Sequence, residues 1–215
     1  MAFYPIFVEM KGRPCLVIGG GGVAEGKVRG LLAADAALTV VAPALTPALA
    51  DLAAAGEIAW QERDYRPGDL EGYAACFVAT DDGGVNAAVA AEGRQRGVWV
   101  NAADDPANCD FILPSVIRQG EVVVAASTGG ASPALARRLR EELTDFLSAD
   151  FAPLAELLAA VRGELKERRV SVDATVWQRA IDPRFRALVA QRRPDEARAY
   201  LIEALGVTAA LETRA

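Results

Sequence analysis

Four consecutive glycines are the residues of this chain whose type and spacing most clearly suggest chemistry. The segment Gly19-Gly20-Gly21-Gly22-Val23-Ala24 follows the apolar run Arg13–Ile18 and opens Val23–Ala34, where apolar residues recur at helical spacing. In a G-x-G-x-x-A arrangement the first glycine permits a tight turn, the second lets the backbone approach a pyrophosphate, and the alanine allows close helix–strand packing. The helix N-terminus adds amide donors and partial positive charge. The turn therefore predicts a dinucleotide-binding site of Rossmann type.

The acidic residue that usually completes such a site is missing. About 20 residues after the glycines, a Rossmann site commonly presents Asp or Glu to the ribose hydroxyls. Here the second predicted strand, Leu38–Val41, is followed by Ala42-Pro43-Ala44. We therefore expect backbone groups around Pro43 and Ala44 to hold the ribose, and the pattern leaves the choice between NAD and NADP open.

A second candidate group follows the fifth predicted strand, Val98–Val100, with the sequence Asn101-Ala102-Ala103-Asp104-Asp105-Pro106. Ligands of open α/β sheets bind outside the carboxyl ends of the strands. Asp104 is therefore placed where a base near a bound nicotinamide would be needed. Asp-Asp-Pro is also ordinary turn chemistry, so the residues alone leave both interpretations open.

A third candidate group is the loop Ser127–Pro133, which is followed by Arg137, Arg138 and Arg140. A hydroxyl- and glycine-rich loop that leads into a helix N-terminus can bind an anion, and arginines nearby can pair with carboxylates. The same residues also fit a capped helix with a solvated basic face. The pattern does not decide between the two.

Composition narrows the chemistry further. The chain has 215 residues, 52% of them hydrophobic, which allows one full domain with a sizeable core and a smaller appendage. The net charge of −6 disfavours nucleic acid as a partner. The sequence contains no histidine, which excludes histidine triads, histidine zinc sites and imidazole proton shuttles. Acid–base work must therefore fall to a carboxylate, a lysine, a tyrosine or the substrate itself.

Cysteine usage and hydropathy suggest a location. Cys15, Cys76 and Cys109 lie far apart and form no Cys-x-x-Cys pair, which favours structural thiols in a reducing compartment. No stretch approaches the ~20 apolar residues of a membrane span, and the first residues lack the features of a signal peptide. We therefore expect a cytoplasmic protein with no membrane partner.

The predicted elements place these groups on an α/β fold. Strands at residues 13–18, 38–41, 58–60, 76–79 and 98–100 alternate with helices, one of which opens at Thr80-Asp81-Asp82. This alternation predicts a parallel sheet with right-handed crossovers. After Asn101 the pattern changes to short strands at 111–114, 115–117 and 121–126, with a turn at 118–120 that makes the last two antiparallel. A helix is expected from Ser132-Pro133 to about Leu147, then helices broken near Gly163, Asp182-Pro183 and Arg193-Pro194.

The order and spacing of five segments resemble a known family. They are Leu16–Lys27, Ala79–Asp82, Asn101–Asp104, Phe111–Ser115 and Ser127–Pro133. Together they resemble the precorrin-2 dehydrogenase module of siroheme synthase, which in many members is also a sirohydrochlorin ferrochelatase. The likeness covers about residues 1–150 closely, and the helical remainder matches in length and character.

The resemblance implies NAD-dependent oxidation of precorrin-2 to sirohydrochlorin in siroheme synthesis. It also implies a homodimer in which the middle region crosses between subunits, and helical ends that help to cover the tetrapyrrole. The family's essential aspartate falls on Asp104, and its nucleotide contacts fall on Gly22-Val23 and Pro43-Ala44. Its serine loop, phosphorylated in some members, falls on Ser127-Thr128, where threonine takes the second position. The expected organisation is a Rossmann-type NAD-binding domain (1–113), a small α+β dimerisation region (114–147) and a helical C-terminal region (148–215).

Residues and resemblance together yield a specific set of predictions. Asp104 is the predicted base, with transient contact to Fe²⁺ as a substrate if the chain is also a chelatase, and no resident metal is expected. The predicted NAD contacts are Gly19, Gly21, Gly22, Val23, Ala24, Pro43, Ala44, Thr80, Asn101 and Ala102. The predicted contacts to the substrate carboxylates are Thr128, Gly129, Gly130, Arg137 and Arg138. The alternatives are an NAD-sensing regulatory module without catalysis and an unrelated dehydrogenase for small acids.

Overall fold

The computed structural model describes residues 3–147 and 149–212, and these form two compact units. The first unit extends to Leu113 and the second begins at Pro114. The predicted dimerisation region and the predicted helical region both fall in the second unit, and their separation stays a prediction. No helix in the described ranges is both long enough and apolar enough to cross a membrane.

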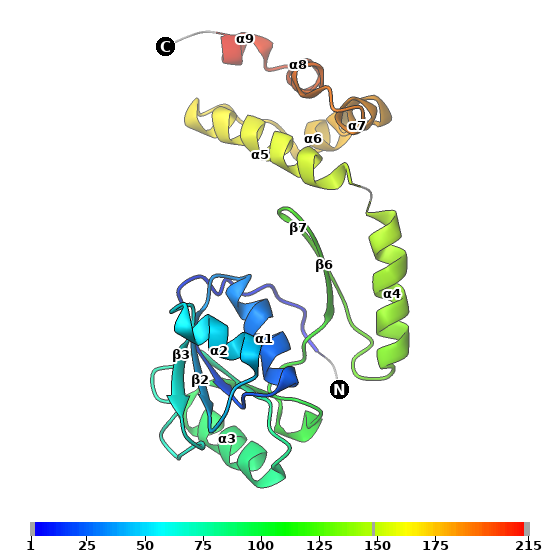
Figure 1. Cartoon of the computed structure of the whole chain (residues 1–215). Coiled ribbons are helices and arrows are strands. Elements are labelled where there is room, and N and C mark those ends of the chain that lie inside the picture. The colour runs from blue at the N-terminus through cyan, green and yellow to red at the C-terminus, as the bar shows by residue number, and fades with distance from the viewer. Residues whose placement is uncertain (1–2, 148, 213–215) are drawn as a thin grey trace. The chain divides into compact units, whose positions relative to one another are not determined.

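The first unit is a five-stranded parallel sheet covered by helices, as the sequence predicts (Figure 1). Its strands lie in the order β3-β2-β1-β4-β5. The strands are β1 (Pro14–Ile18), β2 (Ala37–Ala42), β3 (Ala59–Glu62), β4 (Ala75–Val78) and β5 (Trp99–Ala102). The helices between them are α1 (Gly22–Leu32), α2 (Pro47–Ala54) and α3 (Gly83–Arg96), and a short 3₁₀ turn, Pro106–Asn108, follows β5.

Strand β1 is packed against helices on both faces of the sheet. Its residues Cys15–Ile18 are all buried, so the strand reads as a continuous apolar run and not as an alternation. Cys15 and Val17 belong to one core cluster with α1 and α2, whereas Leu16 and Ile18 belong to another with α3. The glycine turn therefore follows a strand whose two faces are both held by core packing.

The second unit begins with an antiparallel hairpin of β6 (Ser115–Gln119) and β7 (Val122–Ala126). The helices that follow are α4 (Pro133–Phe146), α5 (Phe151–Glu167), α6 (Ala174–Ala180), α7 (Pro183–Ala190), α8 (Pro194–Ala204) and α9 (Thr208–Glu212). The helices after α4 share a core that includes Leu154, Val161, Phe185 and Leu201. None of the residues of α4 is buried, and Leu135 and Phe146 are 51% and 70% exposed.

Three predictions about local structure are wrong. Residues 111–114 form no strand, because the carbonyl of Phe111 accepts a hydrogen bond from Asn101 and its ring packs edge-on against Phe77, at 5.6 Å between centroids. Helix α5 continues through Gly163, since one glycine costs about 1 kcal/mol in a helix and the buried residues of α5 outweigh it. The hairpin turn lies at Gly120-Glu121 and not at 118–120, because Gly120 takes the left-handed conformation there.

A buried carboxylate fixes the long connection between β3 and β4. Glu92 of α3 is 9% exposed, and its oxygens accept hydrogen bonds from Tyr65 Oη at 2.6 Å and from the amides of Gly68 and Leu70. Arg96 Nε also donates to it at 2.8 Å. Burial raises the pKa of Glu92, but these hydrogen bonds and the charge of Arg96 together hold the pKa below its ordinary value.

Replacement of this carboxylate should cost stability in a pH-dependent way. We expect Glu92→Gln to lower the free energy of unfolding at neutral pH by about 2 kcal/mol, because hydrogen bonds to a buried charged group are lost. The folded-state pKa of Glu92 is depressed, so the contribution is complete above the unfolded value of about 4.5 and is lost as pH falls below it. Urea unfolding over this range should show wild type and variant converging in acid.

The matched control is Glu71→Gln. Glu71 lies 3.5 Å from the same arginine but its side chain is 79% exposed, so its loss should change stability by about 0.5 kcal/mol or less. If Glu92→Gln lowered the free energy of unfolding by the same amount at every pH, the stabilising role assigned to the ionised Glu92 carboxylate would be wrong.

Candidate nucleotide-binding and active site

The first two glycines of the turn are required by neighbouring backbone. Gly19 has φ +114°, and a Cβ there would lie 2.3 Å from the carbonyl oxygen of Ala79 at the end of β4. Gly20 has an ordinary φ, but a Cβ there would lie 1.9 Å from the carbonyl oxygen of Ala44. The sequence argument assigned a role to Gly19 and none to Gly20. The contact with Ala44 shows that both positions hold the turn against the ends of neighbouring strands.

The next two glycines instead border open space at the start of α1. A Cβ at Gly21 or Gly22 would meet nothing within 4 Å. Gly21 is the N-cap and makes no side-chain cap, whereas Thr46 caps α2 and Asp82 caps α3. The first amides of a helix have no acceptor within the helix, so those of α1 remain available to an anion. The residues present therefore fit the pyrophosphate of a dinucleotide, and Val23 and Ala24 lie in this same first turn.

The loop after β2 is fastened beside the glycine turn. The amide of Thr46 donates to the carbonyl oxygen of Gly20 at 2.9 Å, and its hydroxyl donates to Glu25 Oε2 at 2.9 Å. Pro43 and Ala44, the predicted ribose contacts, are exposed within this loop. Trp60 Nε1 donates to the carbonyl oxygen of Ala42 at 3.0 Å, a contact that the sequence pattern did not indicate. The role of Pro43 and Ala44 stays a prediction.

Asp104 lies two residues after the end of β5, at the carboxyl edge of the sheet. It is exposed and has φ +55°, a left-handed conformation that aspartate tolerates better than most residues. In the described part of the chain, no side chain hydrogen-bonds to its carboxylate. Its neighbour Asp105 instead stabilises the turn, because Asp105 Oδ2 accepts from Asn108 Nδ2 at 2.8 Å. Asp105 therefore has the turn-forming role that the sequence also allowed, whereas the carboxylate of Asp104 is available to a ligand.

Asn101 and Ala102, the predicted cofactor contacts on β5, are buried and already hydrogen-bonded within the protein. Asn101 Oδ1 accepts from Lys27 Nζ at 2.9 Å, and Asn101 Nδ2 donates to the carbonyl oxygen of Phe111 at 2.9 Å. The amide and carbonyl of Ala102 both contact Cys109 Sγ, at 3.2 and 3.1 Å. Direct contact of either residue with a nucleotide stays a prediction.

Thr80, at the end of β4, is half-buried and lies beside the start of α3. Its hydroxyl donates to Asn86 Oδ1 at 3.3 Å and accepts from the amide of Asp82 at 3.2 Å. The hydroxyl thereby helps to shape the N-terminus of α3. Its predicted contact with the cofactor also stays a prediction.

Lys27 is a further residue at this edge of the sheet to which the sequence argument gave no role. It is half-buried on α1, between the buried Ala24 and Val28. Burial lowers the pKa of Lys27, and interactions with Cys109 and Asp104 oppose that shift. The available signal was its position three residues after Ala24, which places it beside the inner face of α1.

The predicted substrate loop belongs to the second unit and is built as a helix cap. Thr128 Oγ1 exchanges hydrogen bonds with the carbonyl and amide of Ser132, both at 3.1 Å. Gly129 and Gly130 take left-handed conformations, and Ser132 Oγ caps α4 by accepting from the amide of Leu135. The capped-helix interpretation is therefore confirmed, and an anion contact at this loop stays a prediction.

The predicted arginines lie on α4. Arg137 and Arg138 are both exposed, and Arg138 Nε pairs with Glu142 at 2.7 Å. An exposed pair of this kind forms and breaks at little cost. Their predicted contact with substrate carboxylates remains untested.

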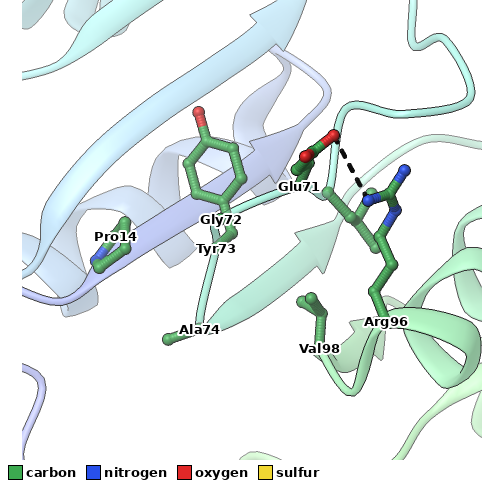
Figure 2. Close-up of a pocket in the computed structure, with 8 residues that line it drawn as sticks. Pro14, Glu71, Gly72, Tyr73, Ala74, Arg96 and Val98 are labelled. Carbon is green, nitrogen blue, oxygen red and sulfur yellow. Dashed lines mark ion pairs between the residues drawn. The ribbon is translucent and has the colours of Figure 1, made fainter.

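The first unit also has a cavity of about 490 Å³ at the opposite edge of the sheet (Figure 2). Figure 2 shows it between Pro14, Ala74 and Val98, which precede or begin β1, β4 and β5, with the Glu71–Arg96 pair at one side. Ligands of open parallel sheets bind at the carboxyl ends of the strands, where the glycine turn and Asp104 lie. This cavity is therefore not the nucleotide site.

Two family descriptions match the chain. Residues 6–115 match the family described as "Putative NAD(P)-binding", and residues 124–145 match "Sirohaem biosynthesis protein central". The first match covers the whole five-stranded sheet, and the second covers most of β7, the loop after it and α4.

Among curated proteins the chain is similar to siroheme synthases. It is 39% identical to that of Sodalis glossinidius over 207 residues, which are 95% of this chain and 44% of the relative. It is 39% identical to that of Methylococcus capsulatus over 214 residues, 99% of this chain and 45% of the relative. The chain thus spans less than half the length of these relatives.

Among solved structures the chain is similar to "SirC, precorrin-2 dehydrogenase". The TM-score is 0.77 at 26% identity, and the match covers 94% of this chain and 100% of that chain.

Proposed function

This chain belongs to the NAD(P)-binding family that includes the dehydrogenase module of siroheme synthase, and from that premise we propose that it oxidises precorrin-2 to sirohydrochlorin with NAD. The observation that carries the proposal is the match to a precorrin-2 dehydrogenase over the entire length of that protein. Siroheme synthases extend well beyond the matched region, so their further activities are not part of the proposal.

The residues of the first unit support this chemistry in separate ways. The uncapped start of α1, at Gly21-Gly22, would hold the pyrophosphate, and the exposed loop at Pro43-Ala44 would contact the ribose. When bound, the nicotinamide supplies the hydride acceptor for the reaction. Oxidation of precorrin-2 removes a proton as well as a hydride, and Asp104 would accept that proton. The absence of histidine from the sequence leaves this carboxylate as the base of choice.

The proposal includes a homodimer formed through the second unit. Helix α4 has no buried residue, and its apolar side chains Leu135 and Phe146 are largely exposed, as expected for a surface that a second copy covers. The match to the family described as "Sirohaem biosynthesis protein central" covers nearly all of this helix. The substrate carries carboxylates, so Arg137 and Arg138 are the proposed partners for them.

The test is an anaerobic incubation of the protein with precorrin-2 and NAD⁺, followed by absorbance of NADH and of sirohydrochlorin. We expect both products to form in equal amounts, with NADP⁺ compared in parallel. No turnover by well-folded protein would overturn the proposal. Addition of Fe²⁺ with sirohydrochlorin in the same cuvette tests whether iron is also a substrate, since loss of the sirohydrochlorin spectrum would report insertion.

The same incubation separates the enzyme from an NAD-sensing module. A sensing module would bind NAD⁺ without turnover and would not need an available carboxylate at Asp104. The comparisons give no support to that alternative.

A further inference from the structure

Lys27 carries a half-buried positive charge toward the carboxyl edge of the sheet. Its side chain leaves α1 and crosses the ring of Phe77 on β4, with Nζ 5.9 Å from the ring centroid. Nζ ends 2.9 Å from Asn101 Oδ1 on β5. A lysine of the first helix is thereby tied to the last strand of the sheet, 74 residues further along the chain.

Asn101 links Lys27 to the segment that carries Asp104. It is 6% exposed, and it lies opposite Phe77 in the register of β4 and β5. Its amide group accepts from Lys27 at one end and donates to the carbonyl oxygen of Phe111 at the other. The segment between Asn101 and Phe111 carries Asp104, and the buried side chain of Asn101 joins its two ends while it accepts from Lys27. The amide of Asp110, which donates to the carbonyl oxygen of Val100, and the contacts of Ala102 with Cys109 close the same segment.

The charge of Lys27 acts on the same segment. Within the described ranges no carboxylate lies within ion-pair distance of Nζ, and its hydrogen-bond acceptor is a neutral amide. Half-burial of an ammonium is costly unless hydrogen bonds or an opposite charge compensate for the lost hydration. Burial lowers the pKa of Lys27, and the charges of Cys109 and Asp104 oppose that shift. A cation at this edge of the sheet would offset the repulsion that a polycarboxylate substrate meets from Asp104.

We propose that Lys27 is a positioning residue of the dehydrogenase reaction, which holds Asn101 and through it the segment that carries Asp104. This inference rests on the proposed function. It assigns Lys27 no contact with substrate or nucleotide, and it makes the Lys27–Asn101 pair the support on which the base depends.

The test compares Lys27→Met and Lys27→Arg with the wild type and with Lys11→Met, an exposed lysine of the same unit, as the control. Methionine keeps an unbranched stem over Phe77 but removes the charge and the donor. We expect kcat for precorrin-2 oxidation to fall about 10- to 100-fold in Lys27→Met, since small misplacement of a reacting group costs that much. The Kd for NAD⁺, measured by calorimetry, should stay within about twofold of the wild type. Lys27→Arg should recover most of the rate, and Lys11→Met should match the wild type.

A double variant tests whether Lys27 acts through Asn101. If the two side chains work as one unit, Lys27→Met combined with Asn101→Ala loses less than the product of the single losses. A double variant whose loss of kcat equals the product of the two single losses would show that Lys27 does not act through Asn101.

Three further outcomes would overturn the inference. They are a Lys27→Met variant that keeps more than half of kcat, one that loses NAD⁺ binding in place of kcat, and an arginine variant as slow as the methionine variant. Failure of the proposed function is visible separately, because the wild-type protein would then produce no NADH from precorrin-2, and the inference would fall with it.

Discussion

Asp104→Asn is expected to lower the rate of precorrin-2 oxidation by about 10²- to 10⁴-fold, the usual contribution of a positioned base. NAD⁺ should bind to the variant as tightly as to the wild type, because the proposed pyrophosphate and ribose contacts lie at the start of α1 and in the loop after β2. Asparagine is the informative replacement here. It has nearly the shape of aspartate and tolerates the left-handed conformation at φ +55°, so a loss of rate reports the missing carboxylate.

The control for this variant is its neighbour, Asp105→Asn. Asp105 Oδ2 accepts a hydrogen bond from Asn108, and an asparagine oxygen can replace it as acceptor. This control should therefore keep most of the rate. Alanine at position 104 is a poorer test, because it would add about 1 kcal/mol of strain in the left-handed conformation. A loss of rate could then come from lower folding stability as well as from the missing carboxylate. Full turnover by Asp104→Asn would refute the assignment of the base.

Gly21→Ala is expected to weaken NAD⁺ binding by about 10- to 100-fold, which corresponds to the cost of a methyl group forced into a close contact. The free protein should fold normally, because Gly21 has φ −86° and a Cβ there meets nothing within 4 Å. The methyl group would instead occupy the space that the pyrophosphate needs at the start of α1.

Its matched partner is Gly20→Ala, one residue earlier. A Cβ at Gly20 would lie 1.9 Å from the backbone oxygen of Ala44, so this variant should lose about 3 kcal/mol of folding stability. Calorimetric NAD⁺ titration and urea unfolding of both variants separate the two roles. Wild-type affinity in Gly21→Ala would show that the nucleotide does not approach this glycine.

The sheet and its helices could be predicted because their signals are local. Strand β1 is buried on both faces, so an uninterrupted apolar run was enough to find it. Helix starts were found through Ser132-Pro133 and Asp82, whose side chains indeed cap α4 and α3. Asp104 could be proposed because the end of a strand is where such sheets bind ligands.

The errors and omissions share a different cause. Phe111 looked like part of a strand because it is apolar, but its apolar character serves the contact with Phe77. The Lys27–Asn101 contact joins residues 74 positions apart, which only the assembled sheet and its first helix bring together. Glycine is required at position 20 because the carbonyl oxygen of Ala44 lies close to it, and the motif alone does not predict that contact.

The start of α1 has one consequence for the thermodynamics of the whole protein. Side chains complete α2 and α3 in the folded chain, but α1 begins at a glycine that leaves its amides unpaired. Anything that binds the native state and not the unfolded one raises stability in proportion to the logarithm of its free concentration. If nicotinamide nucleotide binds there as proposed, it would complete the start of α1, and a rising nucleotide concentration would make the folded protein more stable.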